Sequence, residues 1–230
     1  MTLAEKAYDA LCRDIIRGTL APGRPLRLAD LGARYGMGFS PLREALNRLQ
    51  AERLVTAESL RGFRVAPLSL EELRDAVSLR IVIETEALKA SIKSGDDTWA
   101  AGIVSALYGL NIQAARTGEE ADIWKLEERH HTFHRALLSA CNSPWTLDFF
   151  ERLYAATERY RIPVLLAAAL PAGRDVQAEH SALAEAALAR DTAHATALLE
   201  QHYRRTVESL VEVMQSGEPD LGRRKVAAGA

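Results

Sequence analysis

Apolar residues recur at helical spacing in three short stretches at the start of the chain. The first stretch runs from Leu3 to a turn at Gly18, and the second covers 28–35 and stops near Gly36. The third, over 40–49, places leucine and alanine on one side and polar side chains on the other. Three helices of this length, with a short connection between the second and the third, predict a helix-turn-helix.

The third helix is followed by a pattern that is typical of strands. We expect Ser40 to be the N-cap of this helix and Pro41 its first residue, because proline lacks an N–H that has no helical partner there. Two short runs of apolar and β-branched residues then flank a polar stretch over 57–62, and Pro67 closes the second run. This pattern predicts a small β-hairpin, and therefore a winged helix-turn-helix domain over 1–68.

The rest of the chain has helical periodicity and no strand pattern. We expect Ser69 to cap the first helix of this part, because two glutamates follow it in the first turn. The expected helices cover 70–93, 97–116, 120–140, 144–170, 173–190 and 191–216. The sequence thus predicts a mainly α protein, with an all-α helical bundle for effector binding and dimerisation over 69–217 and a flexible tail over 218–230.

Charge is distributed unevenly along the chain, although the net charge is only −2. The head over 1–69 holds 11 Lys/Arg and 7 Asp/Glu, and the remainder holds 18 and 24. A head of charge +4 on a body of charge −6 fits a DNA-reading domain attached to a domain that does not touch DNA. The sequence has no apolar run of membrane-spanning length, no secretory signal pattern and only two separated cysteines. We therefore expect a cytoplasmic protein with no membrane partner.

The expected recognition helix and hairpin carry residues that suit DNA contact. The N-terminal residues of such a helix face base edges in the major groove, and an arginine-bearing hairpin tip can enter the minor groove. The candidate DNA-binding residues are Phe39, Ser40, Arg43 and Asn47 in the helix and Arg61, Gly62 and Arg64 in the hairpin. The alternative is that Arg43 pairs with a nearby acid and that the two hairpin arginines are only solvated.

Four of the six histidines form a pattern. His130 and His134 are four residues apart on one expected helix, so that both point from the same face. His180 and His202 lie on two other expected helices. Imidazoles that converge from three helices would form a site for a borderline divalent metal such as zinc, whereas a lone pair of this spacing is more often an ordinary surface or core pair. The two remaining histidines, His131 and His194, are expected at the surface.

The head resembles a known family through specific segments. These are FSPLREALNRLQAERLV followed by RGFRV, and IIRGTLAPGRPLRLADLGARYGM upstream. Together they are similar to the DNA-binding domain of the GntR family of bacterial transcription regulators. The resemblance implies that Arg43 and the wing around Gly62 contact DNA. This chain departs from the family at Gly38-Phe39, where Ser-Arg is usual, so its operator is not expected to be the usual one.

The second part resembles the FCD effector domain, which places the chain with the FadR-type subfamily in its shorter, six-helix, VanR-like version. The segments that carry this resemblance are HHTFHRALLSACN, EHSALAEAALARD, His202 and an Arg-x-x-x-Glu pair at Arg80. The resemblance implies that His134, His180 and His202 bind a divalent metal that helps to hold an organic acid. His130 replaces the usual aspartate.

The replacement of that aspartate leaves two readings of the site. If His130 is a ligand, it favours zinc or nickel over manganese, and if it is not, three histidines leave open positions on the metal. Arg80 has two readings as well. It either binds the effector carboxylate or forms a buried ion pair with Glu84 or Glu86.

These observations together predict a homodimeric repressor that binds a palindromic double-stranded operator and responds to a small carboxylate effector. One alternative is a repressor that senses the metal itself, without an organic acid. A metal-dependent hydrolase is disfavoured, because HHTFH has no acid between its histidines to act as general base. We therefore do not expect an enzyme.

Overall fold

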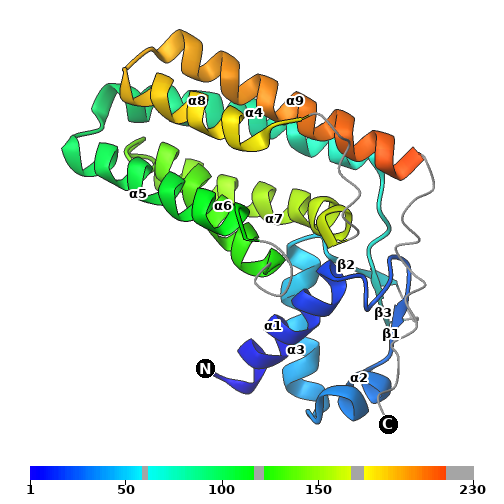
Figure 1. Cartoon of the computed structure of the whole chain (residues 1–230). Helices are drawn as coiled ribbons and strands as arrows, with labels where there is room; N and C mark the ends of the chain where they lie inside the picture. The colour runs from blue at the N-terminus through cyan, green and yellow to red at the C-terminus, as the bar shows by residue number, and fades with distance from the viewer. Residues whose placement is uncertain (59–61, 117–121, 167–173, 216–230) are drawn as a thin grey trace. The chain divides into compact units, whose positions relative to one another are not determined.

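The computed structural model describes residues 1–58, 62–116, 122–166 and 174–215 (Figure 1). In this part of the chain it contains nine helices and one small sheet. The residues pack as two compact units, one built on the first 72 residues and one on most of the later helices. The expected mainly α fold with a winged head and a helical second domain is confirmed.

The head contains three helices around an apolar core. They are α1 (Leu3–Ile16), α2 (Leu28–Tyr35) and α3 (Phe39–Ala51). Leu11 from α1 and Leu42 and Leu46 from α3 are fully buried and belong to one apolar cluster. The turn between α2 and α3 is short because Gly36 adopts a left-handed conformation with φ +64°, which glycine reaches without strain. These helices have the length and spacing that the apolar pattern predicts.

The predicted start of α3 is wrong by two residues. Gly38, with extended backbone, is the N-cap, and Ser40 is the second helical residue without any capping hydrogen bond from its side chain. Pro41 is therefore the third helical residue, which is still within the first turn, where N–H groups lack helical partners. Pro41 therefore lies in the first turn of α3, as predicted, but Ser40 is not the N-cap of this helix.

The wing is a three-stranded antiparallel sheet of order β1-β3-β2. The strands are β1 (Pro25–Leu26), β2 (Val55–Glu58) and β3 (Gly62–Val65). Val55 pairs with Val65 and both are buried, which fixes the register of the hairpin. The hairpin is as predicted, whereas β1 was not predicted, because two residues are too few to show an alternating pattern.

The second part of the chain contains six helices. They are α4 (Leu70–Ser94), α5 (Asp97–Ala114), α6 (Ile123–Leu138), α7 (Pro144–Leu166), α8 (Val176–Leu188) and α9 (Thr192–Gln215). In Figure 1, α4, α8 and α9 form one layer over the layer of α5, α6 and the start of α7. The Ser69 hydroxyl accepts a hydrogen bond from the Glu72 N–H at 3.2 Å, as expected of an N-cap. No described helix is both long and apolar enough to cross a membrane.

The helix α7 takes part in both packing units. From Ala155 onward its residues group with the head, while its first half groups with the other helices. Arg159 donates hydrogen bonds to the carbonyl oxygens of Arg53, Ala66 and Pro67, at 3.1, 2.5 and 3.0 Å. The Arg159 side chain thus provides hydrogen-bond donors for backbone carbonyl groups next to β2 and just after β3. The packing unit that contains the head therefore includes residues of α7 as well as the first 72 residues.

Candidate metal centre and nucleic-acid interface

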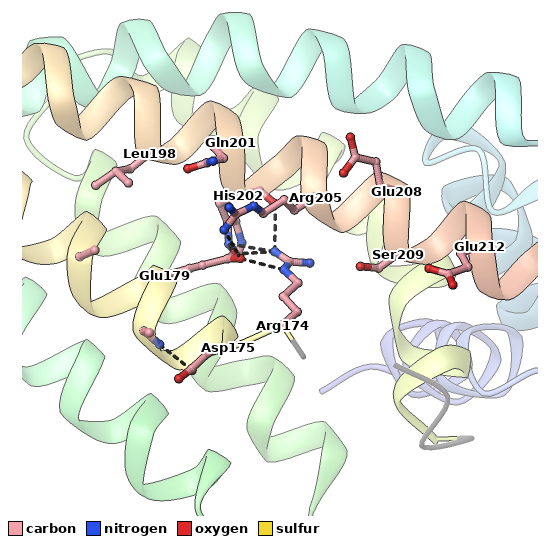
Figure 2. A pocket seen from close by; sticks show the side chains of 12 residues that line it. Arg174, Asp175, Glu179, Leu198, Gln201, His202, Arg205, Glu208, Ser209 and Glu212 are labelled. Carbon is pink, nitrogen blue, oxygen red and sulfur yellow. Dashed lines mark hydrogen bonds and ion pairs between the residues drawn. The ribbon is translucent and has the colours of Figure 1, made fainter. Parts of the chain in front are cut away.

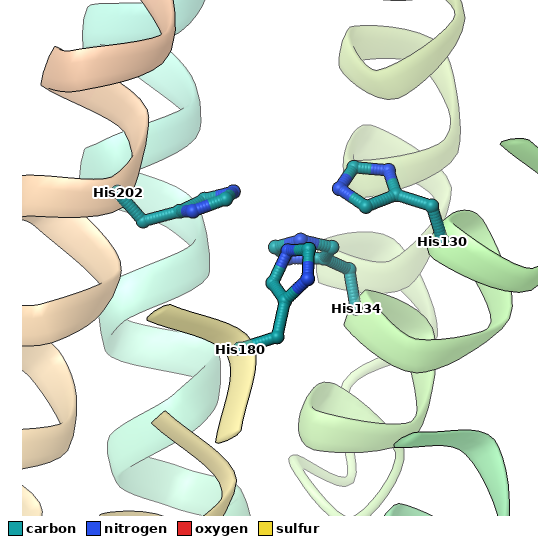
Figure 3. Close-up of side chains that lie close together, drawn as sticks. All are labelled: His130, His134, His180 and His202. Carbon is teal, nitrogen blue, oxygen red and sulfur yellow. The ribbon is translucent and has the colours of Figure 1, made fainter. Parts of the chain in front are cut away.

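Three helices bring four imidazoles together in the second unit. His130 and His134 come from α6, His180 from α8 and His202 from α9, and Figure 3 shows their rings turned toward one another. One nitrogen from each ring lies within 4.8 Å of those of the others. Small side-chain rotations would bring such a set to the roughly 2.0–2.1 Å bonds that zinc makes with histidine. The structure thus brings together all four histidines that the sequence singled out.

The chemistry of these side chains fits a metal ion. His134 is 1% exposed, and its Nε2 atom makes no hydrogen bond in the described structure. A buried imidazole nitrogen in this state costs free energy, which a coordinated cation would recover. Three of the four histidines are buried, and His130 is the most accessible member of the set. The donor set therefore consists of nitrogen atoms only and is largely shielded from water.

Hydrogen bonds from outside the cluster orient two of these rings. The Tyr154 hydroxyl lies 2.7 Å from His130 Nδ1 and donates to the Glu127 carboxylate at 2.5 Å. The Tyr203 hydroxyl lies 3.1 Å from His134 Nδ1 and donates to the Glu84 carboxylate. Since each hydroxyl proton goes to a carboxylate, the tyrosine oxygen accepts from the imidazole Nδ1–H. This arrangement leaves the Nε2 lone pairs for the centre, as in metal sites whose ligands are held by outer partners.

The third ring is held by a carboxylate. His202 Nδ1 donates to Glu179 Oε2 at 2.9 Å, and Glu179 also accepts from Arg174 at 2.6 and 3.0 Å and from Arg205 at 3.1 Å. Burial acts to raise the pKa of the Glu179 carboxyl, but the hydrogen bonds from His202 and Arg174 outweigh burial and lower it. At neutral pH the Glu179 carboxylate is therefore fully ionised where it accepts the Nδ1 proton of His202.

Burial favours the neutral form of two of the imidazoles, His134 and His202, which is the form that a metal requires. Burial lowers the pKa of His134 well below its usual 6.5, and the neighbouring histidines lower it further. Burial also lowers the pKa of His202 to about 4, although the hydrogen bond to Glu179 acts in the opposite direction. At neutral pH a metal ion therefore has no proton to displace from either Nε2 atom.

Arg80 lies directly behind the cluster. It is 2% exposed and forms an ion pair of 2.7 Å with Glu84, which is the buried pair considered as one of its two readings. It also donates to the Tyr203 hydroxyl at 3.0 Å, and its guanidinium lies 4.5 and 5.1 Å from the ring centroids of Tyr203 and Tyr154. Arg80 thus sits between the two tyrosines that orient His134 and His130.

A groove of about 650 Å³ opens beside the cluster on the side of His202 (Figure 2). Glu179, Arg174 and Arg205 line one end of it, and acidic residues including Glu212 line the other. Sequence reasoning missed Glu179 as the partner of His202, as it missed both tyrosines. The residue does stand next to His180 in the EHSALAEAALARD segment, but its contact with α9 depends on how the helices pack.

The candidate DNA-contacting residues of α3 lie on one exposed face. Phe39, Ser40, Arg43 and Asn47 are all exposed, while Leu42 and its apolar neighbours face the core. In the described part of the chain Arg43 forms no salt bridge, so the alternative of an ion pair with a nearby acid is not realised. Within the head, this face of α3 is therefore open to solvent.

The candidate residues of the wing lie in different settings. Gly62 opens β3 with φ +85° and is exposed, as a close approach of the backbone to DNA would require. Arg64 is half-buried and donates to the Gly23 carbonyl, so it also links β3 to the turn before β1. Arg61 lies outside the residues that the structure describes.

A winged head with an exposed third helix, joined to a helical domain with a buried polar centre, is an architecture typical of ligand-responsive transcription regulators. The family model described as "Bacterial regulatory proteins, gntR family" matches residues 3–65, and the FCD domain model matches residues 75–205. The chain belongs to the GntR family of bacterial transcription regulators and carries an FCD domain.

Relatives agree with this assignment. The chain is 39% identical over 218 residues to "Uncharacterized HTH-type transcriptional regulator BphR" of Paraburkholderia xenovorans, covering 93% of this chain and 86% of that one. It is 39% identical over 199 residues to "HTH-type transcriptional repressor GlaR" of Escherichia coli, covering 85% and 90%. The structure of E. coli McbR/YncC matches with a TM-score of 0.74 at 21% identity, over 93% and 99% of the chains, which supports the fold.

Proposed function

We propose that this regulator is a homodimeric repressor whose FCD domain binds a divalent metal and, through it, a small organic acid. The observation that carries the proposal is the set of four inward-facing imidazoles, three of which are held from behind by Tyr154, Tyr203 and Glu179. The name of the relative GlaR, a repressor, supports repression rather than activation. The effector would then release the operator.

Zinc fits the donor set best. Four nitrogen ligands suit a borderline ion such as zinc or nickel. Manganese prefers carboxylate oxygen, and this chain has a histidine at position 130 instead of an acidic residue. With four neutral ligands the bound ion would keep its full +2 charge, and an acid would have to enter as a fifth ligand. That uncompensated charge favours an anionic ligand, and a carboxylate can both bind the ion and pair with a guanidinium.

Arg80 is the proposed partner of the effector carboxylate. Its present ion pair with Glu84 and its contact with Tyr203 link it to the ring of His134. A carboxylate that approached Arg80 would compete with Glu84 for the guanidinium. The same residue would thus belong to the ion pair without effector and to the ligand site with it.

Dimerisation is supported by one face of α5. The helix carries no charged residue from Thr98 to Ala114, yet Val104, Tyr108 and Ile112 are 54%, 68% and 43% exposed along one stripe. A two-fold interface places a patch against its own copy, so that charges at its centre would face like charges. An uncharged apolar stripe is free of this conflict, and a dimer would place two recognition helices on a palindrome.

Metal analysis tests the proposed centre. Full-length protein, purified without chelator and then dialysed against zinc, should hold one zinc per chain, and the His134→Ala/His180→Ala double variant should lose it. The control is the His194→Ala variant, which removes an exposed imidazole from outside the cluster. Equal zinc content in all three proteins would refute the metal site.

Operator binding separates the two regulator models. Fluorescence anisotropy with the cognate promoter should show binding that is selective for a palindrome and weakens steeply with salt. If an organic acid is the effector, a panel of dicarboxylates should change the affinity of zinc-loaded protein by about 5-fold to 150-fold. If the metal is the signal, zinc alone should produce this change and the acids should add nothing.

A further inference from the structure

Phe39 is an apolar side chain in an unexpected place. It is the first residue of α3, and 57% of it is exposed. The exposed neighbours on the same face, Ser40, Arg43 and Asn47, are all polar. The other large exposed apolar residues of the described head lie at the N-terminus of α1 and before it, so Phe39 is not part of a broad apolar patch on α3.

One edge of the Phe39 ring lies near the preceding helix. A Cβ atom placed on Gly32 of α2 would lie 3.6 Å from Phe39 Cε1, which is an ordinary van der Waals distance. The ring therefore has a neighbour in α2 at one edge, while more than half of the residue is open to solvent.

The position of Phe39 decides which chemical group it can recognise. The N-terminal residues of a recognition helix reach base edges in the major groove. A phenyl ring has no hydrogen-bonding group, so it cannot read the donors and acceptors of those edges. Thymine is the one base that presents an apolar group there, its C5-methyl.

We infer that Phe39 selects a thymine at one position of each half-site by packing its ring against the C5-methyl group. This inference rests on the proposed binding of a palindromic operator through α3. It concerns base selectivity at one position, and the remaining contacts of the helix are independent of it. The arginine usual in the family at this position would instead form hydrogen bonds, so the preferred base at this position is expected to differ.

Single-methyl removal tests the inference. An operator is first obtained by in vitro selection with full-length protein, and duplexes are then made in which each thymine is replaced in turn by deoxyuridine. One thymine per half-site should lose about fourfold in affinity, the effect of exposing one buried methyl group, and replacement in both half-sites should cost about fifteenfold. 5-Methylcytosine at that position should bind more tightly than cytosine.

Protein variants assign this effect to the ring. Phe39→Ala should bind the thymine and deoxyuridine duplexes equally at that position and keep any discrimination at all other thymines. Phe39→Leu, which keeps an apolar side chain against Gly32, should retain part of the discrimination. Thermal melting of both variants checks that α3 stays folded, and Phe39→Leu keeps the test valid if the alanine variant is unstable.

Two negative results have different meanings. If Phe39→Ala discriminates thymine from deoxyuridine as the wild type does, the ring does not read the methyl group, while operator binding stands. If selection with the wild-type protein yields no sequence preference at all, the proposed DNA-binding function fails and this inference fails with it.

Discussion

Replacing Glu179 by glutamine should weaken zinc binding although Glu179 is not expected to touch the metal. Its carboxylate accepts the Nδ1 proton of His202 at 2.9 Å and is ionised, since its pKa is lowered by its hydrogen bonds against the effect of burial. A negative charge at this point makes the opposite Nε2 atom a better electron donor and keeps the ring in the required tautomer. Glu179→Gln keeps the shape of the side chain and removes the charge.

The size of the effect follows from the role of such outer partners. Loss of a partner of this kind typically costs about 10-fold to 100-fold in metal affinity, which corresponds to about 1.4–2.7 kcal/mol. Glutamine also offers an N–H₂ group toward Arg174 and Arg205, whose guanidinium groups now donate to Glu179. We expect the upper half of this range, because the neutral amide also ceases to hold the arginines beside His202.

The assay is competition for zinc with a chromophoric chelator, together with thermal melting of the metal-free proteins. Two control variants separate the charge at His202 from general effects. Glu200→Gln removes an exposed carboxylate that pairs with Arg204 on the same helix. Thr206→Val removes a contact of Arg174 at 3.1 Å and a hydrogen bond to the backbone carbonyl of His202, but it leaves the bond between the His202 ring and Glu179 in place. Both should bind zinc within about twofold of wild type. A folded Glu179→Gln protein with wild-type zinc affinity would refute the assigned role.

Four further predictions address the metal, the DNA contact, pH and assembly. His130→Asp should shift the preference toward manganese by supplying a carboxylate, measured as the ratio of zinc to manganese affinities, and an unchanged ratio would exclude His130 as a ligand. Arg43→Ala should weaken specific operator binding by about 1–3 kcal/mol in anisotropy titrations, and unchanged affinity would remove Arg43 from the interface. In metal-free protein the pKa of His202 is lowered from 6.5 to about 4, so the unfolded chain binds a proton that the folded chain does not. The free energy of unfolding, measured in urea titrations, should therefore fall as pH drops from 6.5 to 4, by about 3 kcal/mol through His202, and the lowered pKa of His134 adds to this fall. A flat profile over that range would contradict the burial argument. Tyr108→Glu should yield monomers in light scattering, whereas His194→Glu, also at an exposed helical position, should remain dimeric, and a dimeric Tyr108→Glu protein would place the interface elsewhere.

Much of the fold could be predicted from local patterns. The helix α2 covers the predicted 28–35, and the six later helices begin and end within a few residues of the expected bounds. Helical periodicity, caps and turn residues depend on residues close together in the sequence, so they can be recognised without the tertiary structure. The exception at the start of α3 is informative, because Ser40 has the chemistry of a cap but Gly38 occupies that position.

The candidate metal centre, too, could be predicted only in part from the sequence. The amino-acid sequence is enough to identify the class of protein, the recognition helix with Phe39 at its start, and the four histidines at spacings that allow convergence. The contacts around the cluster follow only from the packing of the helices: Tyr203 of α9 lies against His134 of α6, Glu179 accepts the Nδ1 proton of His202, and Arg80 pairs with Glu84 rather than Glu86. Tyr203 is 69 residues from His134 in the chain and 123 residues from Arg80, to which it is also hydrogen-bonded. They meet because buried apolar faces dictate how the helices pack, and this packing cannot be read from any local period.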